Sequence, residues 1–140
     1  MTSVDYILIS RFYQIAKISV LIYEEISPKL DSKDLQILTS NQMANYDVIT
    51  EECKAISKAH KIPLPDNAFF SRCKQIIAEN FDKYTVIQPE TLMACTTTLS
   101  LHTLVEIYNV ESATSETINI GKHLQLMQEQ FLQLLREIKL

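Results

Sequence analysis

The stretch that decides the fold is Ile120–Ile138, with the sequence IGKHLQLMQEQFLQLLREI. Its apolar residues recur at steps of four and three, which is the spacing of one face of an α-helix. They are Ile120, Leu124, Met127, Phe131, Leu134 and Ile138. The opposite face is polar and carries Lys122, Gln125, Gln128, Glu129, Gln133, Arg136 and Glu137. A single apolar stripe is buried only when other helices pack on it, so this stretch predicts a helix bundle.

Four other segments share this helical spacing and have start or stop signals at their ends. They span residues 3–27, 31–61, 66–84 and 89–108. Prolines interrupt the chain at Pro28, at Pro63 and Pro65, and at Pro89, which suits the first position of a helix. We therefore predict one domain over residues 1–140 with an all-α fold. The expected arrangement is an antiparallel up-down-up-down four-helix bundle with a proline-broken segment between its third and fourth helices. A single helix kinked at Pro89 is the alternative for that segment.

The composition supports a helical fold and argues against several classes of partner. The chain has 140 residues, of which 46% are hydrophobic, but one Gly and four Pro supply too few turns for a many-stranded β fold. Its net charge of −4 and its scattered Lys and Arg give no electrostatic reason to bind nucleic acid or an anionic membrane. No apolar run approaches the roughly 20 residues that cross a bilayer. We expect neither a nucleic-acid nor a membrane partner.

The cysteines and the first residues indicate a cytoplasmic location. Cys53, Cys73 and Cys95 lie on apolar stripes and lack the CxxC spacing of a zinc site. We interpret them as reduced core residues, as expected in the cytosol. The start of the chain, Met1-Thr2-Ser3-Val4-Asp5, lacks the basic flank of a signal peptide.

The segment 3–27 is apolar around most of its circumference. Its polar remainder is Ser10, Arg11, Gln14, Lys17 and Glu24. A helix of this kind is either central in its bundle or shares one face with a second copy of the protein. A homodimer through the helices at 3–27 and 31–61 is the simplest way to bury the surplus face.

The sequence contains none of the short motifs that carry nucleotide or nucleophilic chemistry. With one glycine it cannot form GxGxxG, a phosphate loop or the GxSxG serine elbow. No Glu-x-x-His pair, which supplies metal ligands in di-iron helix bundles, occurs in the chain. The balance is therefore against an enzyme, and no catalytic or cofactor-binding residue is assigned.

Three residues form a weaker candidate site for a divalent metal ion. His102 and Glu106 are four residues apart and can share a helix face. A tight hairpin about residue 111 would bring His102 within one turn of His123, giving two imidazoles and a carboxylate. The competing interpretation is that His102 is a hydrogen-bonded core residue and that no metal binds.

A short motif connects the chain to a known group of folds. The segment 31–61 ends in His60-Lys61-Ile62-Pro63-Leu64-Pro65-Asp66. With its surrounding helices, this motif resembles a bacterial family of unknown function among the ferritin-like four-helix bundles; the likeness covers about residues 40–70. That family is generally exported with a signal peptide, which this chain lacks. The ligand positions of the broader ferritin-like superfamily are not filled here, so the resemblance implies a fold and no activity.

These observations favour a non-enzymatic helical-bundle protein that acts in protein–protein interaction or assembly. The partner is another protein or a second copy of the chain. The first alternative is a degenerate ferritin-like protein that binds metal through His102, Glu106 and His123. The second is a carrier of an apolar small ligand, held among the helices at 3–27, 31–61 and 89–108.

Overall fold

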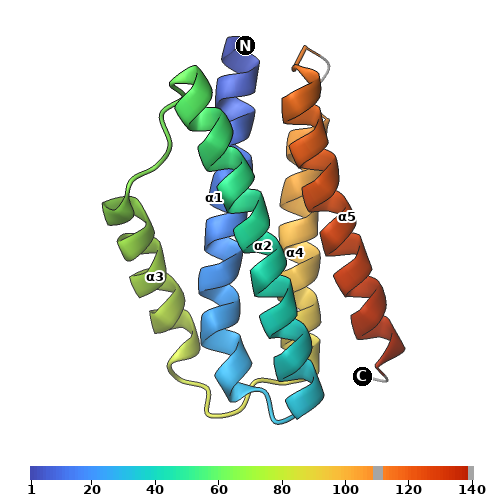
Figure 1. Ribbon diagram of the computed structural model, residues 1–140. Coiled ribbons are helices and arrows are strands. Elements are labelled where there is room, and N and C mark those ends of the chain that lie inside the picture. The colour runs from blue at the N-terminus through green and yellow to red at the C-terminus, as the bar shows by residue number, and fades with distance from the viewer. Residues whose placement is uncertain (109–111, 139–140) are drawn as a thin grey trace.

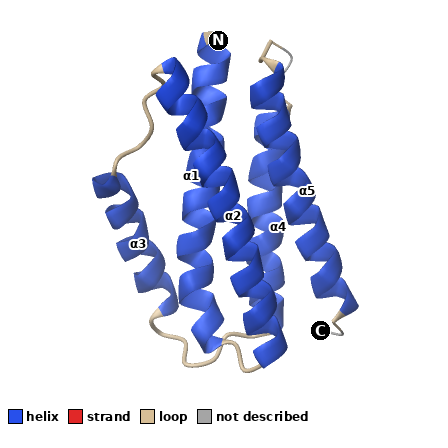
Figure 2. Ribbon diagram, viewed as in Figure 1, coloured by secondary structure: helices blue, strands red, loops and turns tan. Residues whose placement is uncertain are grey.

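The amphipathic segments found in the sequence form helices in the computed structural model, which describes residues 1–108 and 112–138. The elements are α1 (Ser3–Ile26), the 3-10 turn η1 (Ser27–Lys29), α2 (Lys33–His60), α3 (Asn67–Phe81), α4 (Pro89–Ile107) and α5 (Ser115–Glu137). No strand occurs in either described range (Figure 2). The predicted all-α class is confirmed. None of the helices in these ranges has the length and apolar content of a membrane span.

The long helices α1, α2, α4 and α5 stand side by side, and α3 lies at the edge of this group (Figure 1). Each helix runs opposite to the one before it, so α2 and α4, which are separated by α3, run in the same direction. This differs from the up-down-up-down order expected for four main helices, because α3 returns the chain before α4 begins. The break before α4 is real: residues 82–88 are not helical, and Pro89 is the first residue of α4.

Side-chain caps fix several helix ends. Thr2 caps α1, and Asp5 completes a capping box with it. Ser32 and Asp66 cap α2 and α3. Lys61 ends α2 in the left-handed conformation, with φ of 54°.

The helix α1, which is apolar around most of its circumference, is central. It packs against α2, α3, α4 and α5, and Tyr13 of α1 meets Phe70 of α3 edge to face, with 5.6 Å between ring centroids. Phe70 is the one buried residue of α3. The helix α3 thus covers part of the apolar surface of α1 that motivated the prediction of a homodimer through α1 and α2. The homodimer itself stays a prediction.

The deciding stretch lies on α5, and its inward face follows the true helix period. Ile120, Leu124, Met127 and Phe131 are buried as predicted. Towards the C-terminus Leu135 is buried instead of Leu134, which is 44% exposed, because 3.6 residues per turn advance the face beyond a strict three-four pattern. Gly121 was expected to lie close to the preceding helix. A Cβ there would come within 2.8 Å of the Phe12 ring on α1 and 3.4 Å of Ile107 on α4.

Candidate interaction surface on α1 and α4

The outer side of α4 carries almost no charge. Its exposed residues are Glu90, Ala94, Thr97, Thr98, Leu101, His102, Val105 and Tyr108, which follows the helix directly. From Ala94 onward these residues recur at steps of three, one, three, one, three and three, which is a continuous helical face. Beyond Glu90 this face holds no Asp, Glu, Lys or Arg. A solvated helix side normally carries such residues, so this side of α4 is unusual.

The inner side of α4 is made largely of small polar residues. The buried residues are Leu92, Thr96, Leu99, Ser100 and Thr103. The Thr96 hydroxyl donates to the Leu92 carbonyl at 2.8 Å, which satisfies it within the helix. The polarity of α4 is therefore partly inverted, with hydroxyl residues inside and apolar residues outside.

A groove of about 490 Å³ runs between α1 and α4. Its lining residues are Arg11, Gln14, Ile15, Ile18, Ile22, Ala94, Cys95, Thr98, Leu99, His102 and Glu106. At one end the Arg11 guanidinium donates to the Glu106 carboxylate at 2.9 Å. The other end, at Ile22 and Ala94, is apolar. A groove of this size and lining suits a small apolar ligand or the side chains of a protein partner.

Beside the groove and past its charged end stands a cluster of exposed apolar side chains, which we call the apolar cluster: Ile7, Leu101, Val105 and Tyr108. Their exposed fractions are 54%, 56%, 60% and 84%. Ile7 of α1 and Val105 of α4 line the same shallow hollow, so the cluster is continuous between the two helices. Contiguous apolar surface of this kind marks a contact site more often than a solvated face.

The three residues of the predicted metal site do not all lie together. His102 and Glu106 do lie together on the groove wall, but Glu106 is paired with Arg11 of α1. His123 faces α2, where its Nδ1 lies 3.3 Å from the Glu52 carboxylate, because the inward face of α5 passes through Ile120 and Leu124 instead. In the described ranges no group of three or more His, Cys, Asp or Glu residues could hold a metal ion.

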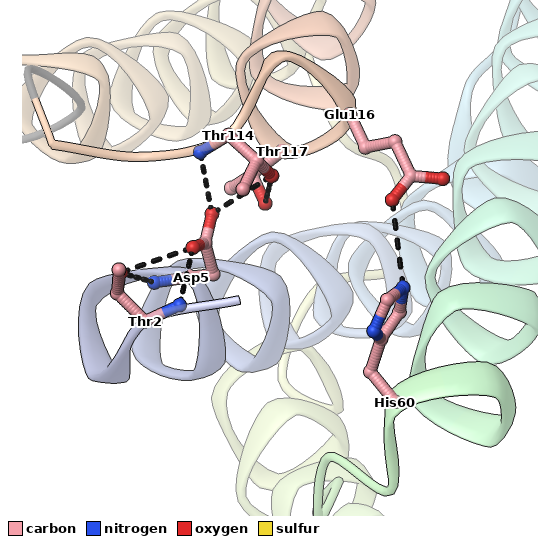
Figure 3. Close-up of polar contacts among 6 residues, drawn as sticks. All are labelled: Thr2, Asp5, His60, Thr114, Glu116 and Thr117. Carbon is pink, nitrogen blue, oxygen red and sulfur yellow. Dashed lines mark hydrogen bonds and ion pairs between the residues drawn. The ribbon is translucent and has the colours of Figure 1, made fainter.

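A second histidine–glutamate pair joins the same two helices. His60 Nε2 of α2 lies 3.6 Å from the Glu116 carboxylate of α5 (Figure 3). Both pairs are partly exposed, so each acts as a surface contact between α2 and α5 and contributes little to stability.

At the centre of the helices lies a buried polar cluster contributed by α1, α2, α4 and α5. Tyr23 and Thr96 share a hydrogen bond of 2.9 Å, and the Gln128 amide nitrogen donates to the Tyr46 hydroxyl at 3.1 Å. Gln42 donates to the Met127 carbonyl at 3.3 Å. A ferritin-type metal pair is held by carboxylates and histidines. The side chains of this cluster are hydroxyls and amides and do not supply that ligand set.

Part of this cluster can be predicted from the sequence. Gln42 is a polar residue on the apolar stripe of α2, whereas Gln128 was predicted to lie on the solvated face of α5. Gln128 is fully buried, and its Oε1 has no hydrogen-bond partner. Burial raises the pKa of Tyr23 and Tyr46, so both phenols stay protonated at neutral pH. The cluster is suited to fixing helix register rather than to proton transfer.

The cysteine thiols are not prepared for nucleophilic chemistry. Burial raises the pKa of Cys53 to about 12, with a smaller contribution from Glu52, and burial also raises the pKa of Cys95. The thiolate is the reactive species, so a raised pKa makes these thiols inert at neutral pH. Cys53 is buried, in agreement with the interpretation of the cysteines as core residues, whereas Cys73 and Cys95 are only half-buried.

The most perturbed acid, Asp5, is structural. Burial raises its pKa, but hydrogen bonds from Thr114, Thr2 and Thr117 outweigh burial and hold the pKa well below its usual range. One carboxylate oxygen accepts from the Thr114 N–H and the other from the Thr2 N–H, both at 2.8 Å (Figure 3). Asp5 therefore ties the start of α1 to the start of α5.

Comparison with known proteins adds no family to this picture. No protein-family model, no curated protein and no solved structure matches the chain. The candidate site therefore depends on geometry alone. Its distinctive features are the uncharged outer side of α4, the groove beside it and the apolar cluster at one end, which suit contact with another molecule.

Proposed function

We propose that the protein is a non-enzymatic interaction or assembly module that acts through the face formed by α1 and α4. The observation that carries this proposal is the outer side of α4, which from Ala94 to Tyr108 exposes apolar and uncharged residues where a solvated helix would carry charges. No residue is assigned a catalytic role: the buried polar side chains of the described residues are phenols, hydroxyls, amides and a capping carboxylate, and only the Gln128 Oε1 among them has no hydrogen-bond partner.

The fold proposed with this function is a four-helix bundle of α1, α2, α4 and α5, with α3 as a return segment packed on α1. A long connection between the second and third main helices is one of the known topologies of such bundles, including the ferritin-like folds. A ferritin-like relationship and a cytoplasmic location remain proposals of the same kind. In this arrangement the partner is another protein or a second copy, and the contact side is α4 rather than the α1–α2 side first expected.

Sedimentation of the purified protein over a wide concentration range tests the function. We expect reversible self-association that Leu101→Glu weakens about 30-fold or more, because a carboxylate in the middle of the contact would be desolvated without a partner. Leu126→Glu is the matched control, since Leu126 on α5 is 53% exposed and Leu101 is 56% exposed. Equal effects of both substitutions would overturn the proposal, and a monomer at every concentration would exclude a second copy as the partner.

The groove between α1 and α4 supports a second candidate function, the transport or storage of an apolar small ligand. Its volume of about 490 Å³ lies in the range of small-molecule sites, and Ile15, Ile18 and Ile22 give it an apolar wall. Native mass spectrometry of freshly purified protein tests this. A bound apolar compound that is lost in Ile18→Glu and kept in Leu126→Glu would support a carrier, and protein of the bare chain mass in every preparation would count against it.

A further inference from the structure

We infer that the partner on the α1–α4 face is a second copy of this chain, with the two α4 helices antiparallel and the two-fold axis passing at Leu101. This inference rests on the proposed function and specifies the partner and its register. It draws on three observations: the order of side-chain sizes along α4, the placement of the groove and the apolar cluster, and the absence of charge.

Side-chain size changes along the exposed side of α4. Its first half presents Ala94, Thr97 and Thr98, and its second half presents Leu101, Val105 and Tyr108. When two such helices lie antiparallel with Leu101 opposite Leu101, residue numbers across the contact add to 202. Tyr108 then lies opposite Ala94, and Val105 lies opposite Thr97. Away from the axis, where Leu101 meets its own copy, these large residues meet small ones, which favours close helix packing.

The groove and the apolar cluster on this face also lie opposite each other across the antiparallel pair. The apolar end of the groove lies beside Ala94 and Ile22, whereas the apolar cluster lies at the Tyr108 end of α4. A two-fold axis at Leu101 exchanges these two ends, so the cluster of each copy faces the groove of the other. A contact in which the same patch serves both subunits closes as a dimer and does not extend into a fibre.

Charge complementarity favours a copy of the same face over the other sides of the protein. The paired region carries Arg11 and Glu106, which already neutralise each other. Its other exposed residues from Ala94 to Tyr108 are uncharged. The outer sides of α2 and α5 instead carry many charges, which would lose water on such a surface. These are Lys33, Asp34, Asp47, Glu51, Lys54, Lys58, Lys122, Glu129, Arg136 and Glu137.

The available area is sufficient for a dimer of modest affinity. The four side chains of the apolar cluster expose on the order of 500 Å² per chain, judged from ordinary side-chain areas. A standard interface buries about 800 Å² per partner. The walls of the groove, with Ile15 and Ile18 half-buried, supply additional apolar surface once the cluster of the partner enters.

Cysteine cross-linking measures the register directly. In a chain with Cys73 and Cys95 replaced by serine, Leu101→Cys should form a disulfide with its own copy under mild oxidation. Thr97→Cys should not, because two residues four positions from the axis lie about 12 Å apart along an antiparallel pair, whereas a disulfide needs Cα atoms within about 7 Å. A mixture of the Thr97→Cys and Val105→Cys chains should cross-link between the two variants.

The outcomes separate this inference from the proposed function. Cross-linking of Leu101→Cys with itself, and of Thr97→Cys only with Val105→Cys, supports the antiparallel pair. Self-linking of Thr97→Cys without the mixed product indicates a parallel pair and overturns the inference while the assembly function stands. A dimer in which none of these cysteines reacts places the contact elsewhere and also overturns it. If the chain with both serine replacements is monomeric while the wild type is dimeric, the cross-linking is repeated with Cys95 retained. The register is then still measured. A monomeric wild type overturns this inference, whereas contact of the same face with another protein still stands.

Discussion

The helices α4 and α5 are neighbours that pack against each other, yet they distribute polarity in opposite ways. On α5 the inner residues are large and apolar, including Leu124 and Phe131, and the outer side carries Lys122, Glu129 and Arg136. On α4 the inner side includes Thr96, Ser100 and Thr103, and large apolar residues lie outside.

This difference separates two causes of apolar residues on a helix: burial when the chain folds, and contact with another molecule. The pattern of α5 is explained by folding alone, since its apolar stripe is buried by α1, α2 and α4. The outer side of α4 contributes little to folding, because its apolar residues remain in contact with water. Its composition is explained if another molecule covers it. The predictions below test this division between the two helices.

The largest expected effect is on the inner side of α5. Leu124→Ala should lower the free energy of unfolding by about 3 kcal/mol, because Leu124 is fully buried and its loss leaves a cavity. Leu101→Ala on the outer side of α4 should change it by less than about 0.5 kcal/mol at low protein concentration, since Leu101 is 56% exposed. Denaturant unfolding of both variants provides the measurement.

Protein concentration sharpens the same comparison. If α4 forms the dimer contact, the melting temperature of the wild type should rise with concentration, and Leu101→Ala should reduce that rise. Leu124→Ala should lower the melting temperature while keeping its dependence on concentration. Two variants with equal losses of stability at low concentration would show that the outer side of α4 belongs to the folding core after all.

The second effect concerns how the two helices begin. The start of α5 is bound to Asp5, whereas α4 begins at Pro89 without a side-chain cap. Asp5→Asn should cost about 2–3 kcal/mol at neutral pH, because the neutral amide cannot accept all the hydrogen bonds that reach the buried carboxylate. Denaturant unfolding between acid and neutral pH measures the loss.

The pH dependence follows from the lowered pKa of Asp5. A carboxylate with a lower pKa in the folded state stabilises the fold above its unfolded pKa of about 3.9, and this stability is lost as the pH falls through the folded pKa. The wild type and Asp5→Asn should therefore differ fully near neutral pH and converge in acid. Asp66→Asn, at the exposed cap of α3, should show no such difference. A constant gap between wild type and Asp5→Asn down to strongly acid pH would contradict this role of the charge.

The sequence predicted the helices well and the surface poorly, for a physical reason. Helical spacing and prolines located α1, α2, α4 and α5 because burial and backbone geometry act locally along the chain. Spacing does not report which polar residues a neighbour will satisfy, so Gln128 was placed in solvent although Tyr46 binds it in the core. The metal hypothesis depended on the rotation of α4 and α5 about their axes, which spacing leaves undefined. The outer side of α4 was not predicted, because spacing does not show which of its apolar residues a neighbouring helix covers.

The smallest of the expected effects tests whether the polar inner side of α4 is specific. Thr96→Val should lower the free energy of unfolding by about 1–2 kcal/mol, since it leaves the buried Tyr23 hydroxyl without its hydrogen-bond partner. Thr97→Val is a matched control one residue along, because Thr97 also donates to the carbonyl four residues earlier but is exposed. It should change stability by less than about 0.5 kcal/mol.

Adding Tyr23→Phe to Thr96→Val completes the test. Removing both hydroxyls leaves no unsatisfied group, so the double variant should regain much of the stability that Thr96→Val loses. A strictly additive double variant would mean that the two hydroxyls do not depend on each other. The small polar residues inside α4 would then serve only to let this helix pack closely on α1 and α5. Its inverted polarity would need no specific hydrogen-bond partner in the core.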